Sequence, residues 1–185
     1  MSEWLKNSRN GVAYLTEPKN DFEDLYIEVR TKEERIHNDD FVRLLPHVPK
    51  GHPHHSEWQK RKWILQRFTN YLKSKKQPTT LEIGCGNGWL TEQIAPYSKN
   101  VYGMDIGQSE LEQAVRCSTH KNTYFMCCDN WSLLPENEFD LILFAGSFQY
   151  FKLDSAFWNQ LFRCLKPGGE IHILDTQFYS KAEAT

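Results

Sequence analysis

The stretch Leu81-Glu82-Ile83-Gly84-Cys85-Gly86-Asn87-Gly88-Trp89-Leu90 decides the fold of this chain. Its first residues are typical of a buried strand, its three alternate glycines of a tight turn, and its last residues of the start of a helix. Glycine tolerates positive φ, and without a Cβ it lets a ligand approach the backbone closely. The stretch therefore predicts a ligand-binding turn between a strand and a helix of an α/β protein.

The spacing of the glycines separates this turn from the best-known one of its kind. It is G-x-G-x-G, whereas the turn that binds a dinucleotide pyrophosphate has G-x-G-x-x-G. An acid, Glu82, stands two residues before the first glycine, and another, Asp105, ends the next predicted strand. Further signals follow in order: Asp129 after a third strand, the loop at 146–151 after a fourth, and Lys166-Pro167-Gly168-Gly169 before a fifth. This ordered set resembles the class I (Rossmann-like) S-adenosylmethionine-dependent methyltransferases, with the glycine turn as their motif I.

Alternating strands and helices predict the fold class. Strands are expected at 80–83, 101–105, 123–128, 139–145 and 170–175, with helices at 89–97, 109–117 and 156–165 between them. This order is typical of a doubly wound, mostly parallel sheet with helices on both faces. The resemblance implies a further helix and two final strands, yet the chain stops ten residues after Asp175. We therefore expect the edge of strand 170–175 to be covered, to pair in a dimer, or to belong to a fragment in which Lys181-Ala182-Glu183-Ala184 begins a helix.

The chain divides into two predicted parts. Residues 1–55 are polar and interrupted by prolines, and we expect them to form an N-terminal lid on the substrate side. Residues 56–185 are expected to form the S-adenosylmethionine-binding domain. Within the first part, residues 22–36 favour a helix, although alternation at 26–30 leaves a short strand open. Asp39 or Asp40 is expected to cap a short helix over 41–45, and Ser56 to cap a helix that continues to Leu72.

Composition narrows the function classes. The 185 residues carry a formal net charge of −2, so no overall positive charge indicates a nucleic-acid partner. No apolar run approaches about 18 residues and the first residues lack the pattern of a signal peptide, which indicates a cytoplasmic protein with no membrane contact. The five cysteines are odd in number and form no C-x-x-C pair, as expected of reduced, buried thiols.

The resemblance implies the residues that bind the cofactor, S-adenosyl-L-methionine. Glu82 would take the amino group of the methionine part, Asp105 the two ribose hydroxyls and Asp129 the adenine amine. Each acid has an alternative: Glu82 could pin loop amides, Asp105 could cap a helix, and Asp129 could form an Asx turn. The other expected cofactor contacts are Gly84, Cys85, Gly86, Gly88, Ile106, Asn130, Trp131 and Gly146.

The substrate side is less defined. The expected residues come from the N-terminal segment and from the loop after the fourth strand: Tyr14, Tyr26, Phe148, Gln149 and Tyr150. None of them is an obvious base, so the catalytic residue is unknown. Four histidines (His47, His52, His54 and His55) lack the spacing of a metal site, and no metal is expected. Residues 43–76 hold nine lysines or arginines against one acid, Glu57, which indicates a solvated helix face or a surface that attracts an anionic substrate.

Together these features predict an S-adenosylmethionine-dependent methyltransferase that acts by in-line displacement. The expected acceptor is a small molecule, and the expected state is a monomer or a dimer. One alternative is a methyltransferase-like module that binds the cofactor or a partner without catalysis. A nicotinamide-dependent enzyme is disfavoured by the glycine spacing.

Overall fold

The computed structural model describes residue 5 and residues 8–178, without the side chains of residues 20–22. The strands are β1 (Ser8–Arg9), β2 (Val12–Tyr14), β3 (Thr79–Ile83), β4 (Asn100–Asp105), β5 (Thr123–Cys127), β6 (Phe139–Ala145) and β7 (Leu165–Leu174). The α-helices are α1 (Asn20–Lys32), α2 (Asp39–Leu44), α3 (His55–Lys73), α4 (Trp89–Ile94), α5 (Gln108–Cys117) and α6 (Ser155–Cys164). Within residues 8–178, the short 3₁₀ helices are η2 (Ala95–Tyr97), η3 (Trp131–Leu133) and η4 (Phe148–Tyr150).

These strands form one seven-stranded sheet in the order β1-β2-β5-β4-β3-β6-β7. All neighbours are parallel except β1 and β2. The five strands expected from the sequence are β3 to β7, and the predicted fold class is confirmed. The reversal of strand order lies between β3 and β6, so the carboxyl end of β3 opens at the position where such sheets bind ligands.

The hairpin of β1 and β2 was not expected. Asn10 (φ 50°) and Gly11 (φ 81°) both have positive φ and join the two strands in a two-residue turn. Asn-Gly is the preferred pair for such a turn because its twist matches that of the flanking strands. Tyr14 of β2 pairs with Cys127 of β5, so residues 8–14 extend the edge of the sheet. The expectation that all of residues 1–55 form a lid is wrong for this hairpin.

The helices before β3 follow the sequence closely, with two corrections at their starts. Residues 20–32 form α1, so the helical interpretation is confirmed over the strand. The cap of α2 is Asn38, whose side chain accepts a hydrogen bond from the backbone N–H of Phe41 at 2.9 Å. Asp39 and Asp40 lie in the first turn instead, where acids suit the positive end of the helix. Helix α3 begins at His55, which places Ser56 inside its first turn.

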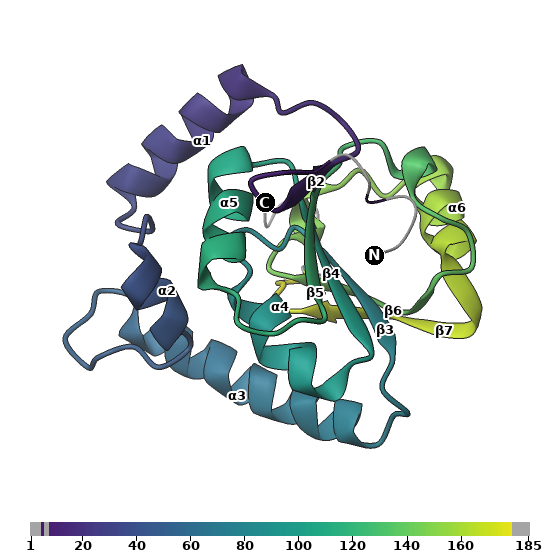
Figure 1. Ribbon diagram of the computed structural model, residues 1–185. Coiled ribbons are helices and arrows are strands. Elements are labelled where there is room, and N and C mark those ends of the chain that lie inside the picture. The colour runs from purple at the N-terminus through teal and green to yellow at the C-terminus, as the bar shows by residue number, and fades with distance from the viewer. Residues whose placement is uncertain (1–4, 6–7, 179–185) are drawn as a thin grey trace.

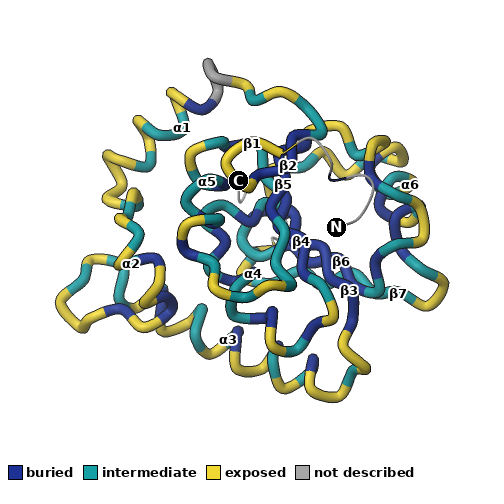
Figure 2. Tube along the Cα trace, viewed as in Figure 1, coloured by how far each residue is buried: buried dark blue, intermediate teal, exposed yellow. Residues whose placement is uncertain are grey.

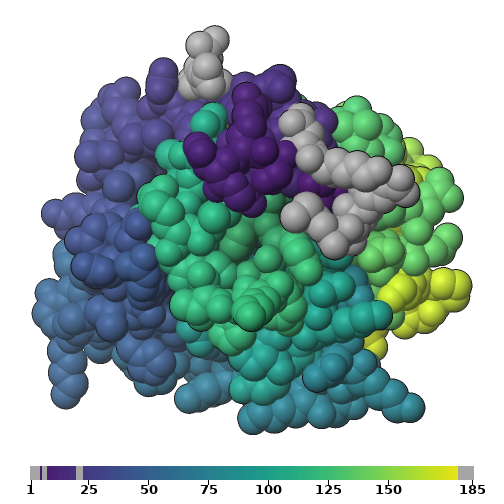
Figure 3. Space-filling model, viewed as in Figure 1, coloured from purple at the N-terminus to yellow at the C-terminus, as the bar shows by residue number. Residues whose placement is uncertain are grey.

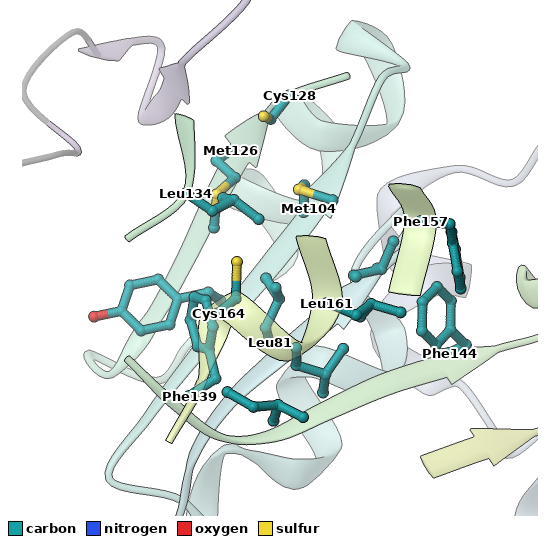
Figure 4. Close-up of a cluster of buried hydrophobic side chains, with 14 of the residues drawn as sticks. Leu81, Met104, Met126, Cys128, Leu134, Phe139, Phe144, Phe157, Leu161 and Cys164 are labelled. Carbon is teal, nitrogen blue, oxygen red and sulfur yellow. The ribbon is translucent and has the colours of Figure 1, made fainter. Parts of the chain in front are cut away.

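Alternation along the strands gives the sheet two apolar faces. Leu81, Met104 and Ile142 point to one face, where Phe157 and Leu161 of α6 cover them (Figure 4). On the other face Leu141 and Leu143 pack against α3 and α4, while Phe125 and Cys127 pack against α5. Figure 1 shows α3, α4 and α5 on one side of the sheet and α6 on the opposite side. The central strands are buried along most of their length, whereas α1 is largely exposed (Figure 2).

At the other edge of the sheet, β7 pairs with β6 alone among the described residues. A register shift separates the pair Phe139–Leu165 from the pair Leu141–Glu170. The predicted turn Lys166-Pro167-Gly168-Gly169 therefore bulges from β7 and does not precede it. The helix expected at residues 181–184 lies outside the described residues.

Candidate active site

A cavity of about 540 Å³ opens at the carboxyl ends of β3, β4, β6 and β7. The glycine turn, the start of α5 and the loops after β5 and β6 form one wall of this cavity. The opposite wall comes from α1, residues 35–37, His54 and the first half of α3. In the space-filling view, the N-terminal residues (purple to blue) lie along one side of the molecule, next to the residues of α5 (Figure 3).

The glycines of the turn serve two different purposes. A Cβ on Gly84 would lie 2.4 Å from the Cβ of Ser147, and one on Gly88 would lie 2.7 Å from both Ala114 and Phe125. With φ of 76° and 72°, these two residues need glycine for packing as well as for conformation. Gly86 differs, because a Cβ there would meet only the carboxylate of Glu110, at 3.4 Å, and the residue lines the cavity. Gly84 and Gly86 line the cavity as expected, while Gly88 supports the turn from below.

Glu82 is the most buried acid of the site, with 2% of its surface exposed. Its Oε2 accepts a hydrogen bond of 2.5 Å from the hydroxyl of Thr91 in α4. Burial raises the pKa of Glu82 to about 8, the charge of Asp105 adds to this, and the bond from Thr91 opposes it. A carboxyl group kept neutral in this way becomes charged when a cation binds beside it. Its place in the cavity therefore suits the ammonium group of the expected cofactor.

Asp105 connects the glycine turn to the start of α5. Its Oδ2 accepts from the N–H of Gly86 at 2.8 Å, and its Oδ1 accepts from Ile106 and Gly107 at 2.7 and 3.0 Å. The carboxylate also lines the cavity. Asp105 thus organises the backbone in front of α5 but does not cap the helix, because the N-cap residue is Gly107 and the first N–H groups of α5 donate to Glu23.

Glu110, in the first turn of α5, is a site residue that the sequence reasoning missed. Its carboxylate lies 3.4 Å from where a Cβ on Gly86 would be, directly above the glycine turn. Burial raises the pKa of Glu110 to about 7, Asp105 adds to this, and Arg30 and a hydrogen bond from Tyr26 oppose it. An acid in the first turn of a helix is ordinarily a favourable partner of the helix dipole, so its sequence position gave no signal of a site.

Of the three cofactor-binding residues predicted after β5, two line the cavity and one does not. Asp129 and Trp131 line the cavity together with Ile106 and Gly146, as expected. Asp129 pairs with Lys19 at 2.5 Å, and this bond lowers the pKa of the carboxyl group. Asn130 lies outside the cavity lining, and its Oδ1 accepts from the N–H of Ser132 at 3.2 Å. The Asx turn considered for Asp129 is therefore formed by Asn130.

Of the five residues expected on the substrate side, Tyr26 and Tyr150 line the cavity. The other three do not. Tyr14 is 5% exposed and packs with the core between β2, β5 and α5. Phe148 packs edge-on against Phe144 at 5.2 Å, inside the aromatic core. Gln149 donates from Nε2 to the carbonyl oxygen of Gly146 at 2.7 Å.

The wall formed by the N-terminal segment and α3 carries several basic groups. Arg30, Arg35 and Arg61 line it, together with His37 and His54. Of the nine basic residues in 43–76, Arg61 alone is among the described lining residues, so most of that run is a solvated face. The sequence reasoning missed Arg30 and Arg35, because isolated arginines in a polar segment carry no pattern.

The histidine-rich segment forms an aromatic cluster. The ring of His52 lies 4.9 Å from that of Phe41 and 5.7 Å from that of His54. Within the residues that the structure describes, no group of three histidines, cysteines or acids is arranged to hold a metal ion. All five cysteines are free and buried, as the sequence predicts.

None of the helices in residues 8–178 combines the length and apolar composition needed to cross a membrane.

Comparison with known proteins points to one family. The family described as "Methyltransferase domain" matches residues 81–173, which is half of the chain. The chain is similar to malonyl-[acyl-carrier protein] O-methyltransferase of Priestia megaterium, with 29% identity over 110 residues. That match covers 58% of this chain and 39% of the relative, so the chain spans about two fifths of the relative's length.

Two solved structures share the fold. One is an S-adenosylmethionine-dependent methyltransferase from Aquifex aeolicus, with a TM-score of 0.56, 20% identity, and coverage of 80% of this chain and 78% of that one. The other is phosphoethanolamine N-methyltransferase 2 of Haemonchus contortus in complex with S-adenosyl-L-methionine. It has a TM-score of 0.57 and 22% identity, and the match covers 82% of this chain and 35% of that one.

Proposed function

Since the chain belongs to the class I S-adenosylmethionine-dependent methyltransferases, we propose that it transfers the methyl group of this cofactor to a small-molecule acceptor. One observation carries the proposal. Four acids from separate parts of the sequence, Glu82, Asp105, Glu110 and Asp129, line one wall of a single cavity around the glycine turn. This arrangement suits a ligand with an ammonium group, two hydroxyls and an exocyclic amine.

The residues of this wall would divide the cofactor among them. Glu82 would bind the ammonium group, since a charge-assisted hydrogen bond there stabilises the complex by about 1.5–3 kcal/mol. Asp105 and Glu110 would accept from the ribose hydroxyls, and Asp129 from the adenine amine beside the ring of Trp131. Gly86 lines the cavity without a Cβ, so the ligand can approach its backbone.

The cofactor supplies an activated methyl group when it is bound. The acceptor forms its bond to the methyl carbon as the carbon–sulfur bond breaks, so the main task of the protein is alignment. Alignment of two reactants accounts for roughly 7–11 kcal/mol of such a barrier. The walls of this cavity supply it, with the strand ends on one side and α1 and α3 on the other.

The N-terminal segment is proposed to act as the lid of this site. Glu23, Tyr26, Arg30, Arg35, His37 and His54 all line the cavity, which supports a substrate-side role for residues 19–55. The hairpin at 8–14 belongs to the sheet and contributes stability instead. A cavity of about 540 Å³ between lid and strand ends matches a small acceptor better than a macromolecular surface.

Calorimetry tests the binding part of this proposal. S-adenosylhomocysteine, the product form of the cofactor, should bind and raise the unfolding temperature, whereas NAD should do neither. Turnover is then tested with S-adenosylmethionine and fractionated metabolites, with release of S-adenosylhomocysteine as the signal. Failure of S-adenosylhomocysteine to bind would contradict the proposal. Binding without release in every fraction would favour the non-catalytic module.

A further inference from the structure

The cavity has walls of opposite charge. The strand-end wall carries the four acids described above. The other wall carries the guanidinium groups of Arg30, Arg35 and Arg61, and one acid, Glu23, whose oxygens accept from the N–H groups of Gln108 and Ser109 in α5. An arginine stays protonated at any physiological pH, so this wall offers fixed positive donors to whatever occupies that half of the cavity.

The guanidinium groups of Arg35 and Arg61 are both hydrogen-bonded to one carboxylate, that of Glu57. Arg35 donates from Nη1 and Nη2 to the two oxygens of Glu57, at 3.0 and 2.8 Å. Arg61 donates from Nη2 to the same carboxylate at 2.7 Å, and its guanidinium stacks 4.7 Å from the ring of Trp58. Glu57 is not among the cavity lining, so it fixes both arginines from the side away from the cavity.

Arg61 also contacts a carboxylate that lines the cavity, that of Asp175. Asp175 follows β7 and accepts from Nε of Arg61 at 2.7 Å. Nη1 of Arg61 takes part in neither of its two bonds. The negative charges of Glu57 and Asp175 offset two of the three positive charges of the arginines. A third acid, Glu33, lies 3.3 Å from Arg30 and 3.4 Å from Arg35. Its side chain is 47% exposed, so water screens its attraction to the arginines.

We infer that the acceptor carries an anionic group, a carboxylate or a phosphate, which Arg35 and Arg61 bind. The end-on fork of Arg35 is taken by Glu57, so the anion would accept from the outer N–H groups of Arg35 and from Nη1 of Arg61. Prior fixation of both side chains by Glu57 reduces the entropy lost on binding. The rings of Tyr26, Trp58 and Tyr150 line the space beside the arginines and suit an apolar or aromatic remainder. This inference deepens the proposed function and rests on it, because the bound anion is taken to be part of the methyl acceptor. Binding of an anion to the arginines can be tested separately.

The test uses three small aromatic probes of similar size. Benzoate, phenyl phosphate and the neutral benzamide are titrated into the whole chain by calorimetry, with and without S-adenosylhomocysteine. At least one anion should bind about tenfold or more tightly than benzamide, as expected for charge-assisted hydrogen bonds. The tighter of the two anions identifies the acceptor group as a carboxylate or a phosphate. Equal affinity of all three probes would overturn the inference.

Variants then locate the site. Arg61→Gln should remove most of the preference for the anion and leave the weak binding of benzamide unchanged. Arg67→Gln is the matched control, because Arg67 lies on the same helix, is exposed and stacks on Trp63 away from the cavity. If Arg61→Gln does not fold, Arg35→Lys is measured instead, since it keeps the positive charge and loses the planar guanidinium. An anion preference that is unchanged in the folded variant would contradict the assignment.

The outcomes separate the two proposals. If S-adenosylhomocysteine binds and no anion is preferred, the anion site is wrong and the methyltransferase proposal stands. If S-adenosylhomocysteine does not bind but the anion preference depends on Arg61, the site is real and the proposed function fails.

Discussion

The two walls of the cavity are built in different ways. On the strand-end wall, Glu82, Gly86 and Asp105 come from one strand, its turn and the next strand, and the N–H of Gly86 donates to the side-chain carboxylate of Asp105. On the opposite wall, Arg35 lies in a segment between helices and is fixed by Glu57, 22 residues further along the chain. The first wall is a property of the shared fold and can be recognised as a motif. The second depends on how the N-terminal segment packs.

The walls meet at the start of α5. Glu23 of α1 accepts from the N–H groups of Gln108 and Ser109, at 3.2 and 2.6 Å, and so caps α5 from another element. Next to this contact, Tyr26 of α1 lies close enough to Glu110 of α5 to lower the pKa of its carboxyl group. The lid is therefore connected to the loop that carries Asp105, and variants on either wall can show how far the two depend on each other.

The largest effect is expected from Gly88→Ala, on the strand-end wall. The new Cβ would lie 2.7 Å from Ala114 and Phe125 at a φ of 72°, so both packing and conformation oppose it. We expect a loss of about 2–5 kcal/mol in the free energy of unfolding, measured by chemical denaturation. Gly51→Ala is the control, since a Cβ there meets nothing within 4 Å. Equal stability of the two variants would contradict the packing role of Gly88.

Glu82→Gln should act on cofactor binding. Loss of the carboxylate should weaken S-adenosylmethionine roughly 10- to 100-fold by calorimetry, because one charge-assisted contact is removed. The variant should also change the pH dependence of stability. The pKa of Glu82 is about 8 in the folded protein and near its ordinary value of 4.5 when unfolded.

Between these two values the folded state of the cofactor-free protein binds the extra proton. Its free energy of unfolding should therefore fall as pH rises from about 5 to 8, by up to roughly 1.4 kcal/mol per pH unit. Glu110, with a pKa of about 7, adds a fall in the same direction below pH 7. Glu82→Gln should flatten the profile above pH 7, and an unchanged slope there would show that Glu82 is charged in the free protein.

Asp105→Ala should weaken S-adenosylmethionine at least about tenfold while the protein still folds. Three backbone N–H groups lose their acceptor in this variant, so a lower unfolding temperature should accompany the weaker binding. Asp129→Ala should have a smaller effect on affinity, because water can replace a single adenine contact. The reverse ranking in calorimetry would mean that the roles of the two acids are exchanged.

The smallest effect is expected from Glu23→Ala, which removes the hydrogen bonds between α1 and the start of α5. Turnover should fall because α1 is no longer fixed to α5. The affinity for S-adenosylhomocysteine should stay within about threefold, since the hydrogen bonds that Glu23 accepts come from Gln108 and Ser109 of α5 and not from the cofactor. Glu28→Ala is the control on the same helix, where the side chain pairs with Lys32 at the surface. Equal turnover of Glu23→Ala and Glu28→Ala would contradict the idea that the contact between α1 and α5 supports catalysis. Deletion of residues 1–40 is a less specific test, because it also removes β1 and β2 from the sheet.

The sequence by itself determined the core of the fold. The continuous apolar run at 139–145 predicted β6, because buried parallel strands need such segments. The alternation of strand and helix patterns predicted β3 at 80–83 and β4 at 101–105. The glycine spacing and the acids that follow strands predicted the strand-end wall, since parallel strands bring their carboxyl ends to one edge. The hairpin at 8–14 was missed although Asn10-Gly11 is its signal, because strands of two and three residues are too short to show a period.

The tertiary structure alone decided which polar side chains reach the cavity. Glu110 and Arg35 have the composition and spacing of ordinary surface residues, and packing of α1 and α3 over the strand ends turns them inward. Tyr14 and Phe148 were expected at the site, but both are apolar enough to be buried in the core instead. Local patterns specify strands, turns and helices, because those depend on neighbours in sequence. The side chains that share a cavity depend on contacts between segments far apart in the chain, and these form only when the whole fold is assembled.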